Sequence, residues 1–283
     1  MIGWRFLLSR RWAGYVVVTI VFAVVCVLLG CWQLARRAEA LAEIAKIESN
    51  YDAHPVPVTE ALPELDSFDD SQKWLPVIMT GQYLVSDQLL VRNRVKDAQP
   101  GFKVLTPLQM ADGNLFLVDR GWLPTGQVQD LPDNVPAPPL GQVTVVARLK
   151  PSEPSLGNRS APAGQIATIE LPLVAELVSK NAYTGAYGLL VSEDPAPETK
   201  PAGSTRPVED EGPHLSYTFQ WFVFALLGCG FLGYLMRQEY RALNESDPHE
   251  QSGSAKRERK RAVKARSDGE IEDEILDSMS SRR

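Results

Sequence analysis

Two long apolar stretches near the ends of the chain dominate its pattern of hydrophobic and polar positions. They run over residues 12–34 and 215–236, and neither contains Asp, Glu, Lys or Arg. At about 1.5 Å per residue, a helix of roughly 22 residues is about 33 Å long, which matches a hydrocarbon core of about 30 Å. The pattern therefore predicts two transmembrane helices, over 12–35 and 214–236. The residues between them must fold on one side of the membrane.

The helical pattern continues beyond the first apolar stretch. Between Leu34 and Glu48, apolar residues recur at a spacing of three or four, with charged residues between them. We expect the first helix to run on into solvent. Pro55, Pro57 and Pro63 then interrupt regular structure.

From Trp74 the period of the pattern changes to two, which is typical of short strands. Gly81 is expected to begin a turn, and 111–114 (Ala-Asp-Gly-Asn) is expected to join two strands. Residues 171–180 have the spacing of one short amphipathic helix. The fold class expected for 36–213 is α+β, a mostly antiparallel β domain with one or two short helices. The predicted strands are 74–80, 88–95, 101–108, 115–121, 142–150, 165–170 and 187–192.

The distribution of charge predicts the orientation in the membrane. Three acidic residues, 209–211, precede the second apolar stretch, while Arg237 and Arg241 follow it, and seven basic residues lie between 256 and 266. Lys and Arg accumulate on the cytoplasmic side. We therefore expect a plasma-membrane protein with both termini, 1–11 and 237–283, in the cytoplasm. The 237–283 tail is charged and expected to be disordered.

Composition narrows the function of the middle region. Residues 36–213 contain 24 acidic and 15 basic side chains, which disfavours nucleic acid as a partner because phosphate binding needs clustered Lys and Arg. Cys26, Cys31 and Cys229 all lie in the apolar stretches, so the middle region has neither a disulfide nor a thiolate site. The alternative that Cys31 belongs to a cleaved lipoprotein signal is disfavoured by the length of the apolar run.

Catalytic motifs are scarce. The sequence has no Gly-x-Ser-x-Gly, phosphate-loop or HExxH motif. His54 stands alone in a proline-rich loop and is expected to be solvated. Asp119 and Arg120 follow an apolar strand and are expected to form a structural charge pair. An exported hydrolase is therefore disfavoured, and catalytic residues are not assigned.

The strongest candidate site lies at the start of the second apolar stretch. At 100° per residue, one helix face carries a histidine, two aromatic residues and two small residues. A neutral imidazole can bind haem iron, aromatic rings can flank a macrocycle, and small residues would leave space for it. The other interpretation is an aromatic belt at the membrane surface. The residues on this face are His214, Tyr217, Trp221, Ala225 and Gly228.

Five blocks in order resemble the surfeit locus protein 1 family, over roughly residues 12–240. The first is Trp32-Gln33-Leu34-Ala35-Arg36, and the last is 214–222 (HLSYTFQWF), which is similar to the family's H-x-x-Y-A-x-Q-W-F block. Three further blocks resemble the external domain of the family. The first combines 81–83 and 91–94, the second is 100–108, and the third is 118–124.

The resemblance implies a non-enzymatic factor that assists assembly of haem–copper cytochrome c oxidase by delivering or retaining haem a. Its partners would be the oxidase catalytic subunit, other respiratory-complex subunits and membrane lipid. His214 would be the candidate iron ligand, and Arg36 would either pair with a haem propionate or snorkel to the interface. The implied cofactor-binding residues are His214, Tyr217, Gln220, Trp221, Trp32, Gln33 and Arg36.

Thr218 departs from the family pattern, in which Ala is usual, and we expect it to alter how closely a ring fits the helix face. The alternative function is a permanent accessory subunit of a respiratory complex that carries no cofactor of its own.

Overall fold

The computed structural model describes residues 4–157, 161–178 and 181–244. Most of the predicted charged tail therefore lies outside the described residues. The chain divides into two compact units. One combines the residues up to Arg37 with those from Gly212 onward, and the other is Ala38–Glu211.

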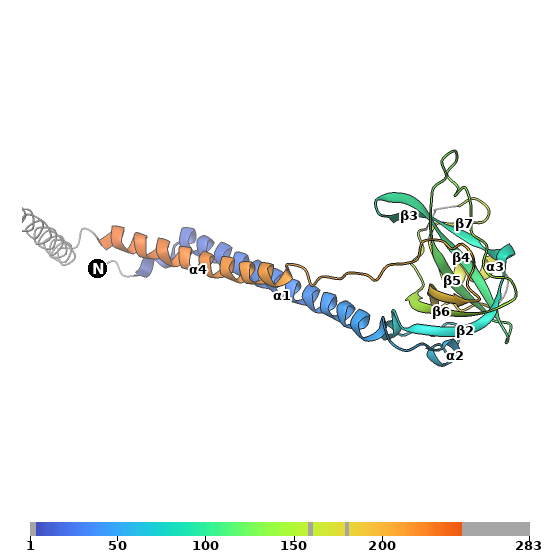
Figure 1. Cartoon of the computed structure of the whole chain (residues 1–283). Coiled ribbons are helices and arrows are strands. Elements are labelled where there is room, and N and C mark those ends of the chain that lie inside the picture. Colours follow the sequence, from blue (N-terminus) through green and yellow to red (C-terminus); the bar gives the residue numbers. More distant parts are fainter. Residues whose placement is uncertain (1–3, 158–160, 179–180, 245–283) are drawn as a thin grey trace, which may run out of the picture. The chain divides into compact units, whose positions relative to one another are not determined.

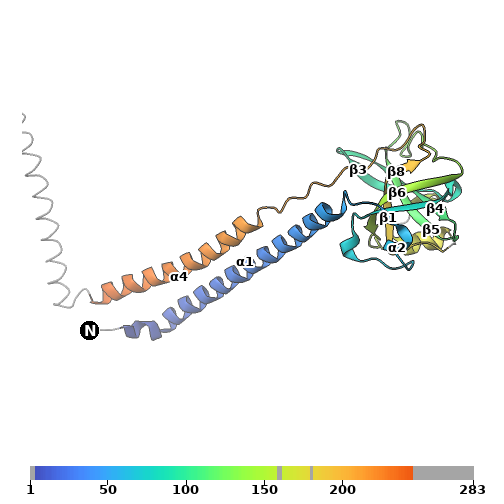
Figure 2. The same ribbon diagram turned by 60° about the horizontal axis from the view of Figure 1, so that its bottom comes forward.

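Proline-free apolar sequence forms the two long helices, α1 (Arg10–Asn50) and α4 (His214–Asn244). In the first unit they lie side by side in opposite directions (Figures 1 and 2). Arg11 near the start of α1 forms an ion pair with Glu239 near the end of α4, with 2.7 Å between Nη2 and Oε1. Both helices are long and apolar enough to cross a bilayer.

Both helices extend beyond their apolar stretches. α4 ends eight residues after the predicted limit of the second span at 236, in a segment that includes Glu239. The predicted extension of α1 is confirmed, since the helix continues to Asn50. Its last turns belong to the second unit, where Ile47 is buried and Glu43 pairs with both Lys46 and Lys73.

The second unit is built around a closed β-barrel. Five strands pair in a ring in the order β2–β6–β8–β5–β4, and β4 pairs again with β2. Figures 1 and 2 show these strands curled around one another. The strands are β2 (Pro76–Tyr83), β4 (Gln99–Met110), β5 (Leu115–Pro124), β6 (Gln142–Pro151) and β8 (Ala186–Asp194).

Four of the five pairings in the ring are antiparallel, and β5 with β8 is parallel. The prediction of a mostly antiparallel domain is therefore confirmed, as is the α+β class. β3 (Leu89–Lys96) extends the sheet beside β4, and the two-residue strands β1 (Val56–Pro57) and β7 (Gln165–Ile166) add parallel edges. The turn predicted at 111–114 is present, with Gly113 at φ +83°.

The turn predicted at Gly81 is wrong. Gly81 lies inside β2, where it is paired with Met110 of β4 and with Val143 of β6. A Cβ at this position would clash with the backbone carbonyl of Gln109. The glycine is therefore needed where β4 approaches β2 and closes the barrel, and not for a change of chain direction.

Other strand boundaries also differ from the prediction by one to four residues, and two of these differences have a local cause. β2 begins at Pro76 and not at Trp74, because Trp74 has φ +72°, outside the extended region that a regular strand requires. β7 ends at Ile166 and not at 170, and the Ile169 N–H is bonded to a carboxylate oxygen of Glu153 at 2.9 Å. That N–H is then not available to a neighbouring strand.

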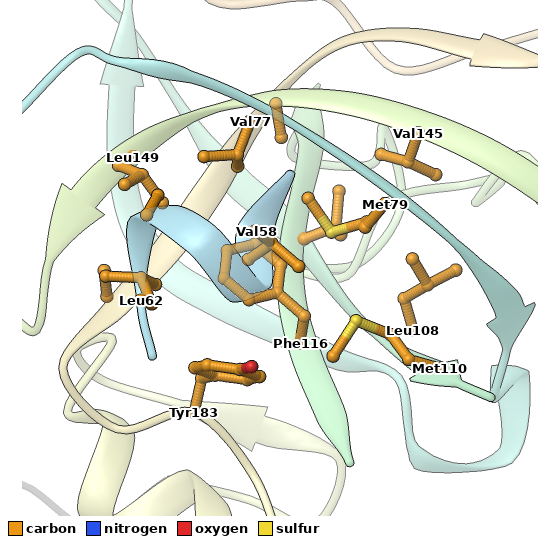
Figure 3. Packing of buried hydrophobic residues seen from close by; sticks show 14 of the residues in the cluster. Val58, Leu62, Val77, Met79, Leu108, Met110, Phe116, Val145, Leu149 and Tyr183 are labelled. Atoms are coloured by element: carbon orange, nitrogen blue, oxygen red, sulfur yellow. The ribbon is translucent and has the colours of Figure 1, made fainter. Parts of the chain in front are cut away.

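Two hydrophobic clusters fill the second unit. The first contains alternate residues of β2, β4, β5 and β6, together with Val58 and Leu62 from α2 (Val58–Ala61) and the residue after it. Figure 3 shows Val58 and Phe116 among the buried side chains of this cluster. The second joins Tyr51 and Trp74 to the opposite side of β5 and to α3 (Leu171–Val178). β5 is thus buried on both faces, which explains its almost continuous apolar run.

Candidate functional site

The candidate site in the first unit is centred on His214, the first residue of α4. Its Nδ1 atom lies 2.8 Å from Oε1 of Gln33 on α1. Because a carboxamide oxygen only accepts hydrogen bonds, this partner places the proton on Nδ1 and leaves the lone pair on Nε2. The imidazole is therefore held in the tautomer that can bind a metal ion through Nε2.

The backbone before His214 shapes its surroundings. Gly212 has φ +67°, a conformation that favours glycine, and a Cβ there would lie 3.3 Å from both Cδ2 and Nε2 of the imidazole. Pro213 follows, and its carbonyl accepts the first helical hydrogen bond from the Tyr217 N–H at 3.1 Å. The Gly212-Pro213 pair thus starts the helix and leaves room for the ring.

Thr218 lies one turn after His214 and does not project into an open face. Its side chain is buried, and its hydroxyl donates to the His214 carbonyl at 2.9 Å. Threonine commonly makes this bond to the preceding turn of its own helix. Thr218 therefore acts mainly by a hydrogen bond within the first turn of α4, and not by contact with a ligand.

The structure brings together some of the predicted site residues and leaves others apart. Gln33 and His214 are joined by a hydrogen bond, whereas Trp32, Tyr217, Gln220 and Arg36 have exposed side chains. Trp221 is half-buried and contacts Phe224 edge to face, with 5.9 Å between ring centroids.

The space expected beside Gly228 is not open. A Cβ at Gly228 would lie 3.0 Å from the ring of Phe22 on α1, so this small residue accommodates the neighbouring helix. The lower part of the predicted face is therefore a helix–helix contact. The exposed part of this face lies at the start of α4, around His214 and Tyr217, and a ligand can approach it there.

The charge pair predicted between Asp119 and Arg120 is wrong. Neighbouring residues of a strand point to opposite faces, and each side chain has a different partner. Asp119 is bonded to Lys103 on β4 at 2.6 Å, whereas Arg120 contacts Glu193 on β8 at 3.5 Å. Burial raises the pKa of Asp119, while the Lys103 ammonium opposes that shift. His54 is exposed in its loop, as expected.

A cluster of basic and aromatic side chains in the second unit was not found from the sequence. It lines a cleft of about 530 Å³ and includes Trp74, Lys150 and Trp122. These residues are far apart in the chain, and although Trp122 belongs to the 118–124 block, Trp74 and Lys150 belong to no motif, so the folded structure alone reveals the cluster.

The fold and the site define a class: a small β-barrel domain whose chain continues at both ends into antiparallel helices of membrane-spanning length. The family model described as "SURF1 family" matches residues 20–226. The chain belongs to the SURF1 family.

Individual relatives agree with this assignment. The chain is 35% identical over 245 residues to an uncharacterised SURF1-like protein of Mycobacterium tuberculosis, covering 84% of this chain and 88% of the relative. It is 26% identical to surfeit locus protein 1 of Mus musculus, covering 75% and 71% of the two chains. It is also 29% identical over 120 residues to the cytochrome oxidase assembly protein SHY1 of Saccharomyces cerevisiae, covering 41% and 30%.

Proposed function

We propose that this protein is a membrane-anchored, non-enzymatic assembly factor for haem–copper cytochrome c oxidase. Membership of the SURF1 family carries this proposal, because a relative bears the name cytochrome oxidase assembly protein. The two helices of spanning length supply the anchor. The charge distribution supports an orientation in the plasma membrane with both termini in the cytoplasm and the barrel domain outside. The oxidase catalytic subunit is then the proposed partner.

The finer proposal is that the His214 site holds haem a during its transfer to the oxidase. The donor set fits, since Gln33 fixes the imidazole tautomer in which Nε2 is a ligand. When bound, haem a would supply an iron atom that takes a nitrogen ligand. His214 would provide that nitrogen, and Gln33 would hold the ring in position.

The exposed aromatic residues would complete the site. Tyr217 follows His214 by one turn of α4 and is 47% exposed, while Trp32 precedes Gln33 on α1 and is 55% exposed. Both rings are available to cover a flat apolar ligand. Arg36, three residues after Gln33, would pair with a propionate carboxylate.

The experiment is to co-express the full chain with haem a synthesis, purify it in detergent and record the Soret band. We expect bound haem a in the native protein, and its loss or a shifted band in His214→Ala. Gln33→Leu keeps the ligand but removes its hydrogen bond, so partial loss is expected. Ser216→Ala is the matched control, because residue 216 is exposed and lies about 200° around α4 from His214.

The same variants should be introduced into cells that lack the native gene, and the assembled oxidase should be measured by its haem a content. A gene deletion that leaves oxidase unchanged would contradict the assembly role. Normal assembly by His214→Ala would remove the haem site but keep the assembly role. Stoichiometric recovery of the protein in mature oxidase would favour a permanent subunit.

A further inference from the structure

A basic cleft on the barrel unit has no role in the function proposed above. Its volume is about 530 Å³, within the range of small-molecule sites. It is lined by Trp74, by residues of β3, β4, β5, β6 and β8, and by the segment 202–205. Ala202 is fixed to β5 by two hydrogen bonds with Trp122, of 2.8 and 2.9 Å.

The lining of the cleft is positively charged although the unit as a whole is acidic. Four of its lining residues are cationic and no lining residue is acidic. Arg94 and Lys103 already have acidic partners, Glu153 at 3.0 Å and Asp119 at 2.6 Å. Among the residues that the structure describes, Lys96 donates only to the neutral carbonyl of Gly203, at 2.8 Å.

Lys150 is the second cation without a compensating carboxylate. Its ammonium lies 4.2 Å from the centroid of the Trp74 ring, and no hydrogen bond or ion pair joins it to any part of the chain that the structure describes. Burial lowers the pKa of Lys150 to about 8, and repulsion from Lys73 and Lys103 adds to this effect. The cleft thus contains two ammonium groups, on Lys96 and Lys150, whose charge is left for a ligand to balance.

Two indole rings give the same cleft an apolar surface. Trp122 is fixed by a hydrogen bond from its Nε1 to the Arg94 carbonyl at 2.7 Å. Trp74 is held at φ +72°, which costs about 1–2 kcal/mol for a residue other than glycine. Strain of this kind persists only where the surroundings impose it, and it often accompanies a binding site. Here it places the Trp74 ring under the Lys150 ammonium.

We propose that this cleft binds a carboxylate attached to a flat apolar group, with Lys150 and Lys96 pairing with the carboxylate and Trp74 and Trp122 contacting the apolar part. A carboxylate fits better than a phosphate. The Arg94 guanidinium, the group best suited to phosphate, already binds both carboxylate oxygens of Glu153. Two ammonium groups remain for one carboxylate.

The carboxylate has two possible sources, a free aromatic acid or the terminal carboxylate of a partner chain that ends in an aromatic residue. The open cleft and the fixed segment 202–205 are compatible with both sources. The inference does not depend on haem binding, because all its residues belong to the second unit.

The test is isothermal titration of the full-length protein in detergent with indole-3-acetate. We expect saturable binding that weakens at least tenfold for indole-3-acetamide, which lacks the charge, and for inorganic phosphate. Lys150→Met should weaken the binding of indole-3-acetate at least tenfold, whereas Lys150→Arg should retain most of it. Lys200→Met removes the same charge from an exposed position outside the cleft and should have no effect.

The source of the carboxylate is tested by a pentapeptide ending in Trp with a free carboxylate, against the same peptide with an amidated end. Tighter binding of the free peptide than of indole-3-acetate would assign the site to a partner chain, and weaker binding would assign it to a small acid. The proposal is overturned if indole-3-acetate does not saturate, if the acetamide or phosphate binds equally well, or if a Lys150→Met protein with native circular dichroism binds like the wild type.

Discussion

The ring of Phe222 on α4 covers Gly30 on α1, so that a Cβ added at Gly30 would lie 3.1 Å from the ring Cζ. The reciprocal contact, Phe22 over Gly228, repeats this arrangement further along the two helices. Helices in lipid gain little from hydrophobic burial and associate through close packing at small residues. The two contacts therefore set the register that places Gln33 beside His214.

Gly30→Leu is expected to separate the helix pair, because its side chain cannot share the space of Phe222. The measurement is the thermal unfolding midpoint of the full chain in detergent, together with haem a content. Gly14→Leu is the control, since a Cβ at Gly14 meets no atom within 4 Å. Equal midpoints for the two variants would show that the Gly30 contact does not hold the pair together.

Arg120→Met is expected to destabilise the barrel by about 3–5 kcal/mol, because it leaves the Glu193 carboxylate buried without its partner. It also removes the 2.9 Å hydrogen bond to the Pro136 carbonyl, which holds the proline-rich connection. Denaturant unfolding followed by tryptophan fluorescence measures the loss. Adding Glu193→Gln should recover part of it.

The control for Arg120 is Arg206→Met, which breaks a surface pair with Asp52 whose side chains are 47% and 69% exposed. Exposed pairs contribute about 0–1 kcal/mol, so its effect should be small. Similar losses from the two variants would contradict the importance of the buried pair.

Ala98→Gly is expected to stabilise the protein by about 1 kcal/mol, because Ala98 has φ +61°. Asp97 and Ala98 form the two-residue turn between β3 and β4, and both have positive φ. Such turns favour glycine at the second position. The unfolding midpoint in denaturant measures the gain, and Ala111→Gly, in a turn position without positive φ, should give none.

Lys150→Met is expected to stabilise the ligand-free protein at neutral pH, since it removes a half-buried cation. The pKa of Lys150 is lowered to about 8 from an ordinary 10.5, so between these pH values the unfolded chain binds more protons than the folded protein. The contribution of Lys150 to the free energy of unfolding of the wild type must therefore become more favourable as the pH rises from about 8 to about 10.5. The advantage of Lys150→Met is therefore largest below pH 8 and disappears above about pH 10.5.

Charged residues on neighbouring elements also act on Lys150, and they should be left unchanged when the wild type is compared with Lys150→Met. Lys73 and Lys103 repel it, while Glu153 and Glu43 attract it. Stability curves of the wild type and Lys150→Met, measured from pH 6 to 11, should converge at high pH. A constant difference between the curves would indicate a packing effect instead of a charge effect.

Local patterns explain which parts of the molecule the sequence predicted well. The two long helices and the strands of the barrel follow from residue spacing, which depends only on near neighbours along the chain. The same spacing did not reveal that Gly81 lies in a strand, because its requirement comes from the Gln109 carbonyl of a different strand.

The amino-acid sequence by itself determined the two apolar helices, the alternation of the strands and, through its ordered motifs, membership of the SURF1 family. Tertiary structure alone decided that the sheet closes between β2 and β4, that Gln33 bonds to His214, and that Lys150 lies over Trp74. Each of these contacts joins residues distant in the chain, and their partners are selected by the packing of whole elements, which no local period encodes.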